Sequence, residues 1–421
     1  MRSIVHLLSY ICSFLLARAL LFSSPLVLAS ILTPDAYAQI EWALATATLA
    51  VALVTVGTGG LVPIVLIGNS AVGPSIRSIR WHHLLDAGNS LLVALLSYLT
   101  ACDVRLWQVP LLIGVLTLTT LRSIELRTNE QASASLFVDA LLLVSMAVFA
   151  FLSTRLWENF GPWLGPILVL AVLVLLLLRD LRSEMCHGCW RAPALRDEWL
   201  CAMAAGIPLM LTGALATLIT TSGRAGAGWL LIPQAAADYS VLSRGAALPI
   251  VAHQILVVAV FRKLFEATPK ALDRLQTTIV ALVSASSLLF WWLLPLYDDL
   301  LGPAFAGAAS AHRDSLLILL AQAVLWSAIA LNDTLNARSG SAGAVLRWSA
   351  PSLIVIFACS WMTFTAGPAS LNRFVLIHSL AMLSFFVCQT AAMWRHGVRA
   401  LQMATTACLT FLALFALALT S

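Results

Sequence analysis

The chain has 421 residues, of which 61% are hydrophobic and 10% charged, and its mean hydropathy is +0.94. Soluble globular domains carry about 25% charged residues, so this chain has too few charges to cover itself with a polar surface in water. The net charge of +5 does not indicate a nucleic-acid partner, because the basic residues are scattered in pairs between apolar runs. The composition therefore predicts an integral membrane protein.

The apolar runs predict an all-α fold. Each is about 20 residues long without strict alternation, which is typical of transmembrane helices rather than of a barrel. The run from Ile4 to Leu32 is too long for the apolar part of a signal peptide, although Ala36-Tyr37-Ala38 looks like a cleavage site. We therefore expect thirteen spans at approximately 9–32, 40–66, 83–101, 106–124, 135–153, 162–178, 199–221, 245–261, 275–296, 315–331, 346–366, 372–394 and 401–420.

The basic residues between the spans predict the orientation. If the N-terminus is cytoplasmic, 17 of the 24 Lys and Arg residues fall in cytoplasmic segments. An excess of Lys and Arg is the mark of cytoplasmic loops, so we expect a cytoplasmic N-terminus. The opposite side then holds Arg105, Arg155, Arg224, Arg313 and Arg373.

The longest cytoplasmic connection predicts the division of the chain. It runs from about Arg179 to Glu198, with six spans before it and six or seven after it. Because six is even, both halves enter the membrane in the same direction, as in a parallel repeat of two bundles. We expect six-helix bundles at 1–180 and 199–394, a cytoplasmic linker at 181–198, and an extra C-terminal helix at 395–421.

Arg18 lies inside the first span, at a depth of roughly 14–20 Å. A charge at the bilayer centre costs at least about 2.5–3.5 kcal/mol on insertion scales, so Arg18 should face a cavity or a partner. It fits a site for an anionic ligand, because guanidinium matches phosphate with two hydrogen bonds. The alternative is a structural ion pair with an acid such as Asp139 or Asp86.

Other charged residues extend this hypothesis. Arg244 begins the eighth span and Arg224 precedes it, so both are candidates to line a cavity, with a headgroup anchor as the alternative for Arg224. Asp139, early in the fifth span, is the candidate for binding a coupling proton or cation, unless it pairs with an arginine. Glu41 and Asp86 fit water-facing or Arg-paired groups better.

Small residues and prolines interrupt two spans. Gly57-Thr58-Gly59-Gly60 interrupts the second span, and Gly206 with Pro208 marks a similar place in the seventh. Such segments permit either close helix packing or a helix break. The candidate hinge residues are Gly57, Gly59, Gly60, Pro63 and Pro208.

No cofactor, metal site or enzymatic activity is expected. Cys186-His187-Gly188-Cys189 offers three zinc ligands but no second pair, and Trp190 stands where a haem motif needs His. Most of the eight cysteines lie in apolar runs, where Cys behaves as a small hydrophobe. The chain contains no P-loop, GxSxG, HExxH or Rossmann glycine pattern.

Two stretches of the sequence resemble a known family. Arg18 in an apolar helix is followed by Ile31-Leu32-Thr33-Pro34-Asp35-Ala36-Tyr37-Ala38 and then by Gly57-Thr58-Gly59-Gly60. This series resembles the polysaccharide flippases, the Wzx-type O-antigen transporters of the multidrug/oligosaccharidyl-lipid/polysaccharide (MOP) exporter superfamily, with Ala38 where the family usually has Gly. The stretch from Arg224 to Tyr239 looks similar to their second half, with Gly223 where the family often has Asp.

The resemblance implies a MATE- and MOP-like fold with two six-helix bundles around a central cavity. It also implies a bacterial inner-membrane transporter that flips a polyprenyl-pyrophosphate-linked oligosaccharide for surface polysaccharide such as lipopolysaccharide O-antigen. Arg18 and Arg244, then Arg224, are the residues implied to bind the anionic head. The implied partners are this glycan-lipid, membrane lipid, and a polysaccharide polymerase or glycosyltransferases.

Two alternatives remain open. A drug or cation antiporter of the same superfamily would need a clearer acid cluster than Asp139 offers. A membrane-embedded glycan polymerase, ligase or acyltransferase would use Tyr297-Asp298-Asp299 and His312-Arg313-Asp314, the acidic-plus-His cluster of the outer loops 222–244 and 297–314. Those loops are short for such an enzyme.

The Lys and Arg distribution yields a topology prediction. In a variant that retains only Cys186 and Cys189, a membrane-impermeant thiol reagent should leave intact cells unlabelled, because the 179–198 connection is cytoplasmic. A permeant reagent should label the same cells. Labelling by the impermeant reagent would reverse the predicted orientation.

Overall fold

The structure, a computed structural model, consists of helices throughout the part of the chain that it describes, with no strand there. The described residues are 2–67, 75–100, 106–129, 131–156, 161–187, 192–251, 253, 256, 268–297, 301–339, 342–365 and 370–420.

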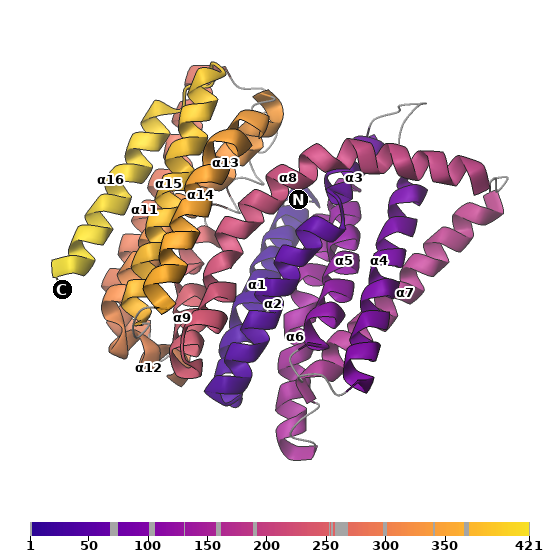
Figure 1. The fold of residues 1–421 in the computed structure, drawn as a ribbon, viewed down its shortest axis with the longest axis horizontal. Coiled ribbons are helices and arrows are strands. Elements are labelled where there is room, and N and C mark those ends of the chain that lie inside the picture. Colours follow the sequence, from indigo (N-terminus) through magenta and orange to yellow (C-terminus); the bar gives the residue numbers. More distant parts are fainter. Residues whose placement is uncertain are drawn as a thin grey trace. The chain divides into compact units, whose positions relative to one another are not determined.

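The chain forms two compact units (Figure 1). The first unit comprises Met1–Thr33 and Ala43–Thr217, and the second comprises Pro34–Trp42 and Leu218–Ser421. Helices α2 and α8 are each divided between the two units by these bounds. The helices that begin in the first unit, together with α2, are α1 (Arg2–Ile31), α2 (Pro34–Val54), α3 (Thr58–Ile67), α4 (Ile76–Leu99), α5 (Gln108–Thr128), α6 (Ala132–Leu156), α7 (Gly161–His187) and α8 (Ala192–Leu230).

The second unit continues from the end of α8. Its α9 begins with Pro233. Proline is favourable at the first helical position, because the backbone N–H that it lacks would have no partner within the helix there. The remaining helices are α9 (Pro233–Ala246), α11 (Pro269–Tyr297), α12 (Pro303–Ala311), α13 (Arg313–Ser339), α14 (Ala342–Thr365), α15 (Leu371–Arg395) and α16 (Leu401–Thr420).

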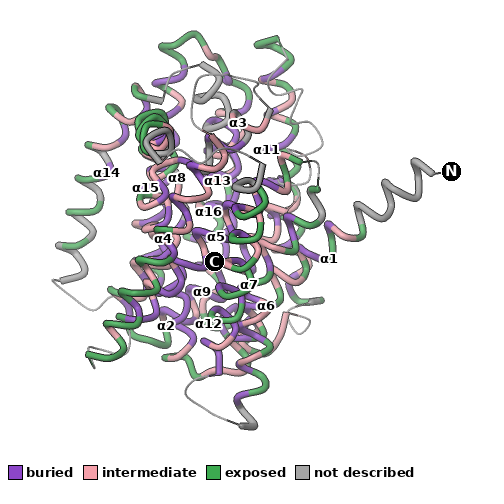
Figure 2. The backbone as a smooth tube through the Cα atoms, turned by 90° about the vertical axis from the view of Figure 1, so that its right-hand side faces the viewer, coloured by how far each residue is buried: buried purple, intermediate pink, exposed green. Residues whose placement is uncertain are grey.

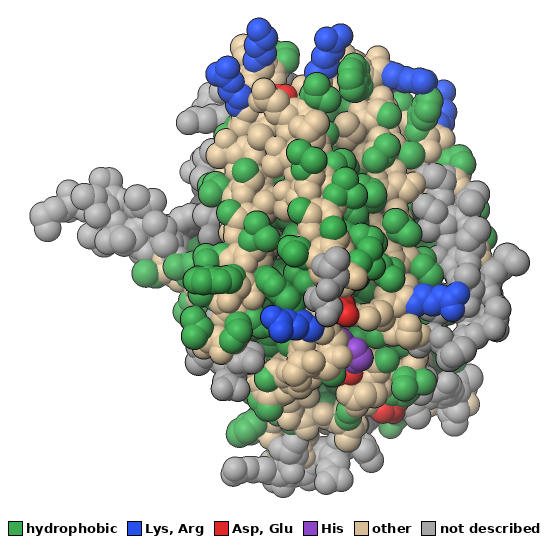
Figure 3. All heavy atoms as spheres, turned by 90° about the vertical axis from the view of Figure 1, so that its left-hand side faces the viewer, with side chains coloured by type: hydrophobic (Ala, Val, Ile, Leu, Met, Phe, Trp, Pro, Cys, Tyr) green, Lys and Arg blue, Asp and Glu red, His purple; other side chains and the backbone are tan. Residues whose placement is uncertain are grey.

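The helices have the length and composition of membrane spans. Within the described ranges, nine of them are long and apolar enough to cross a bilayer. Figure 3 shows one face on which hydrophobic side chains are spread over the middle, while Lys and Arg gather at the upper end and again lower down, near Asp, Glu and His. Buried and exposed residues alternate along most helices (Figure 2), as expected where one helix side packs inside a bundle and the other faces lipid. The chain is a multi-pass membrane protein.

Polar residues join α13 to α15 in the second unit. Gln322 donates a hydrogen bond of 2.7 Å to Ser379 Oγ, and Asn332 donates one of 3.3 Å to Thr390 Oγ1. Between membrane helices such bonds replace the hydrophobic driving force that lipid removes. The extra C-terminal helix is held differently, because Asp273 of α11 accepts the backbone N–H groups of Gln402 and Met403 at 3.2 and 3.1 Å.

Several segments expected to be loops are helical. The expected outer loop 222–244 consists of the end of α8 and most of α9, and only Leu231 and Ile232 connect them. Its small, mostly uncharged residues extend the helix that precedes them. The expected loop 297–314 contains α12, and the expected linker 181–198 is mostly occupied by α7 and α8. The division into two six-helix bundles at that linker stays a prediction. In the eighth expected span, 245–261, residues 252, 254, 255 and 257–261 lie outside the described residues.

The expected interruption of the second span is a break between α2 and α3. Val56 and Gly57 have φ values of 48° and 69°, in the left-handed region that a β-branched residue rarely adopts. Two contacts support this backbone within the first unit. His83 Nε2 of α4 lies 3.0 Å from Thr58 Oγ1, and a Cβ added at Gly206 of α8 would lie only 2.1 Å from the Val56 carbonyl oxygen.

Gly206 should therefore be intolerant of any side chain. In Gly206→Ala the new methyl must displace the Val56 carbonyl, and we expect a loss of about 1–3 kcal/mol, as for other overpacked interiors. The measurement is the apparent melting temperature of the detergent-purified protein.

Gly213→Ala on the same helix is the matched control, because nothing lies within 4 Å of the added Cβ. Alanine stabilises helices relative to glycine, so this variant should melt at the same or a higher temperature. Equal melting temperatures for the two variants would contradict the close contact.

Candidate functional site

Glu41 is a buried acid of the second unit. It lies on α2, seven residues after Pro34, and its side chain is 2% exposed. A carboxylate removed from water needs an opposite charge and hydrogen bonds, because its desolvation is otherwise too costly. Tyr37 lies one turn earlier on the same helix face and donates a hydrogen bond of 3.1 Å to Glu41 Oε1.

Arg224 and Arg244 supply the opposite charge. Arg224 lies near the end of α8, and its Nη1 donates a 3.2 Å hydrogen bond to Glu41 Oε2. Arg244 lies in the last turn of α9, and its Nη2 is 3.3 Å from Oε1 and 3.2 Å from Oε2 of Glu41. The structure thus joins two of the three predicted substrate-binding arginines at one carboxylate. We call Tyr37, Glu41, Arg224 and Arg244 the Glu41 cluster.

The Glu41 cluster carries one more positive than negative charge. Its carboxylate is almost inaccessible, whereas the side chains of Arg224 and Arg244 are 21% and 18% exposed. One carboxylate neutralises only one of two guanidinium groups, and each guanidinium carries five N–H donors. The cluster therefore presents excess positive charge at a partly accessible place, which suits an anion with several oxygen acceptors.

A second polar cluster surrounds Gly223 on α8. A Cβ added there would lie 2.0 Å from the Tyr239 hydroxyl oxygen and 2.9 Å from Cε1 of His378, so only glycine permits this approach. His378 Nε2 lies 3.2 Å from Ser222 Oγ, and its Nδ1 lies 3.3 Å from Gln322 Oε1. These contacts hold this part of α8 against α9, α13 and α15.

Arg18 lies on α1 in the first unit. Its guanidinium carbon is 5.5 Å from the centre of the Phe14 ring, which is within the range of a cation–π contact. The side chain is half-buried, and the same helix packs on α6 through Phe14, Ala17 and Leu136. The role of Arg18 in binding a substrate stays a prediction.

The two acids considered as partners of Arg18 contact other residues. Asp139 forms an ion pair with Arg127, and Asp86 Oδ2 lies 3.2 Å from His82 Nε2. Asp139 is thus paired with an arginine, as the alternative to a coupling-ion site supposed. The arginine is Arg127 and not Arg18. Binding of a coupling ion by Asp139 stays a prediction.

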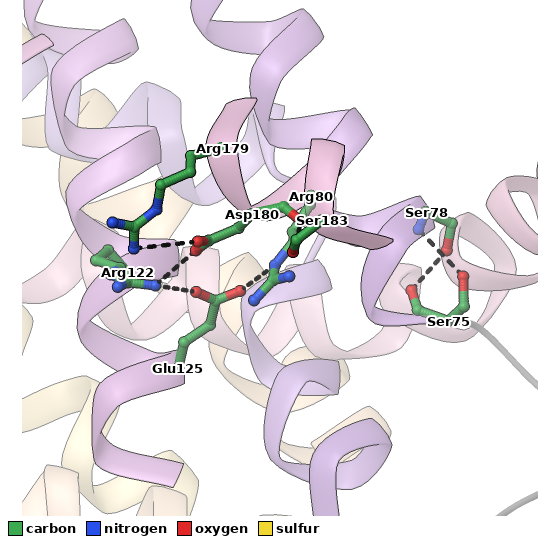
Figure 4. Close-up of polar contacts among 8 residues, drawn as sticks. All are labelled: Ser75, Ser78, Arg80, Arg122, Glu125, Arg179, Asp180 and Ser183. Carbon is green, nitrogen blue, oxygen red and sulfur yellow. Dashed lines mark hydrogen bonds and ion pairs between the residues drawn. The ribbon is translucent and has the colours of Figure 1, made fainter. Parts of the chain in front are cut away.

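An ion-pair network in the first unit was not predicted from the sequence. Glu125 of α5 pairs with Arg80 at 2.7 Å and Arg122 at 3.2 Å, and Asp180 of α7 pairs with Arg122 at 3.1 Å and Arg179 at 3.6 Å (Figure 4). The arginines were interpreted only as markers of cytoplasmic loops. The sequence signal for this network was an acid close to an arginine near the end of a helix. Glu125 follows Arg122 on α5, and Asp180 follows Arg179 on α7.

The predicted hinge residues have different places. Gly57 lies in the break between α2 and α3, whereas Gly59, Gly60 and Pro63 lie within α3. Pro208 lies within α8, whose helical backbone is continuous there. A hinge motion at these positions stays a prediction.

The remaining predicted groups are only partly described. The Cys186–Cys189 motif lies outside the described side chains, as do Asp298 and Asp299. His312 of the same outer segment lies 3.4 Å from Asp238 Oδ2, so this histidine takes part in a pair with α9.

No protein-family model and no curated protein sequence matches the chain. Several solved structures are similar to it, including a flippase and a multidrug transporter. The lipid II flippase MurJ in its inward closed conformation matches with a TM-score of 0.61 and 13% identity over 98% of this chain and 93% of that chain. An inward-facing multidrug resistance MATE family transporter of the MOP superfamily matches with a TM-score of 0.57 and 12% identity over 89% and 93%. The chain therefore has the fold of MOP superfamily transporters.

Removing the charge of Glu41 should destabilise the second unit. Glu41→Gln leaves two partly buried guanidinium groups without their shared carboxylate, and breaking a buried pair in this way costs up to about 3–5 kcal/mol. The measurement is again the melting temperature of the detergent-purified protein.

Asp139→Asn is the matched control, because it breaks an ion pair whose Arg127 side chain is largely exposed. Such pairs contribute about 0–1 kcal/mol, so the melting temperature should change little. A Glu41→Gln protein as stable as Asp139→Asn would show that the Glu41 cluster does not depend on its carboxylate.

Proposed function

We propose that this protein, built on the fold of MOP superfamily transporters, flips a polyprenyl-pyrophosphate-linked oligosaccharide across the bacterial inner membrane for surface polysaccharide synthesis. The single observation that carries the proposal is the Glu41 cluster, in which two arginines share one buried acid. Because one positive charge is left over, the cluster favours an anionic ligand over a cationic one. The fold supports transport, since a flippase and a multidrug transporter are among the similar solved structures.

Pyrophosphate suits arginine better than it suits lysine. Its oxygens accept paired hydrogen bonds from the planar guanidinium fork, whereas an ammonium group acts as a point charge. Arg224 and Arg244 come from the ends of two successive helices, α8 and α9, so their guanidinium groups approach one carboxylate from two directions. We propose that these two residues and Arg18 of α1 bind the pyrophosphate head during transport.

Transport is then a conformational change in which no covalent bond forms or breaks. The break at Gly57, with left-handed backbone at two successive residues, is the proposed hinge of the first unit, together with Gly59, Gly60 and Pro63. Pro208 on α8 is the second proposed hinge. Asp139 is the proposed site for a coupling proton or cation, and glycosyltransferases and a polysaccharide polymerase are the proposed functional partners.

A drug or cation antiporter is the second candidate, because one similar structure is a MATE transporter. Such a protein needs a carboxylate that is available to a cation or proton. Glu41 is instead contacted by two arginines and a tyrosine, and Asp139 is paired with Arg127. The charge of the described sites therefore favours the flippase.

Loss of Arg18 should abolish transport without loss of the protein. A deletion strain would be complemented with each variant, and surface polysaccharide and membrane protein levels would be measured together. Arg18→Ala should make no polymer, because the proposed pyrophosphate contact is gone, and Arg18→Lys should retain part of the activity, because it keeps the charge. Arg244→Gln should also lose polymer.

Arg373→Gln on α15 is the matched control, because its side chain is exposed. It should support normal polymer. Normal polymer from Arg18→Ala at wild-type protein levels would refute its role. Unchanged polymer in the deletion strain itself, with increased drug sensitivity, would identify the antiporter instead.

A further inference from the structure

A shallow crevice lies between α5 and α7 in the first unit. Leucines from both helices line it, among them Leu118 and Leu176, and Arg122, Glu125 and Asp180 complete the lining. On each helix the leucines precede the charged residues by no more than two turns. The crevice is therefore apolar on one side and charged on the other, and it suits an amphiphile.

The ion-pair network at the charged side of the crevice has an excess of positive charge, although only Arg122, Glu125 and Asp180 of this network line the crevice itself. Around Glu125 and Asp180, Figure 4 shows the guanidinium groups of Arg80, Arg122 and Arg179, so three positive charges face two negative ones. Both carboxylates are more buried than the outer arginines. The Arg122 side chain is 27% exposed and that of Arg179 is 72% exposed.

The ion pairs also fix the arginines in place. Arg122 contacts both Glu125 and Asp180, at 3.2 and 3.1 Å, which restricts its side chain before any ligand arrives. Arg179 lies farther from Asp180, at 3.6 Å, and its side chain is mostly exposed. Its guanidinium group therefore remains accessible to an outside acceptor. A preorganised guanidinium beside an accessible one favours a group with several oxygen acceptors, such as a phosphate.

We propose that this crevice binds an anionic phospholipid of the surrounding bilayer. The phosphate contacts Arg179 and Arg122, and an acyl chain lies against the leucines of α5 and α7. Basic pockets between membrane helices near the interface are the expected places for anionic headgroups. Net positive charge selects phosphatidylglycerol over zwitterionic phosphatidylethanolamine. The site is separate from the Glu41 cluster and does not rest on the transported substrate.

Native mass spectrometry of the full-length protein tests this proposal. The detergent-purified protein would be titrated separately with phosphatidylglycerol and phosphatidylethanolamine, and the bound lipid counted. Phosphatidylglycerol should bind more tightly. Arg179→Gln should weaken its binding about fivefold, which corresponds to the loss of about 1 kcal/mol. Arg182→Gln removes the same charge from an exposed neighbouring position on α7 and should bind like the wild type.

A second pair of variants tests the apolar half. Leu176→Trp fills the crevice without changing its charge and should reduce phosphatidylglycerol binding, whereas Leu175→Trp adds the same bulk at an exposed position outside the lining. Melting temperatures would show that both proteins are folded. Equal binding of the two lipids, or equal effects of Arg179→Gln and Arg182→Gln, would overturn the proposal. So would undiminished phosphatidylglycerol binding by folded Leu176→Trp.

Discussion

The ion pairs of Glu41 with Arg224 and Arg244 determine most of what can be inferred about this protein. A buried charge in an apolar helical protein is stable only beside an opposite charge and hydrogen-bond partners. This requirement joins the start of α2 to the ends of α8 and α9, which are far apart in the sequence. It also leaves one positive charge in excess, and the inferred chemistry of the ligand follows from that excess.

The helices could be predicted from the sequence because lipid imposes a simple rule. A backbone at membrane depth must satisfy its own hydrogen bonds, so each long apolar run is a helix. The rule says less about where a helix ends. Residues 222–230 were expected to be part of the outer loop between the spans at 199–221 and 245–261, yet α8 continues to Leu230. In this segment the small residues permit close packing, as Gly223 does against Tyr239 and His378.

The site could be predicted only in part for a related reason. Arg244 was recognised as a candidate because it begins the eighth expected span, and Arg224 because it lies in the segment before that span. Their shared partner Glu41 was assigned only a general role, because an ion pair across about 200 residues leaves no local pattern. The network of Arg80, Glu125 and Asp180 was missed likewise, since basic residues near helix ends already have an explanation as topology signals.

The sequence separation within the Glu41 cluster also determines when its ion pairs can form during synthesis of the chain. Glu41 is synthesised 183 residues before Arg224 and 203 residues before Arg244. At about 5–20 residues per second, roughly 10–40 s pass between the acid and its second arginine. Until Arg224 is made, Tyr37 is the one donor of the cluster that is present in the nascent chain. The second unit therefore acquires its central ion pairs late in biosynthesis, after the helices of the first unit have been made.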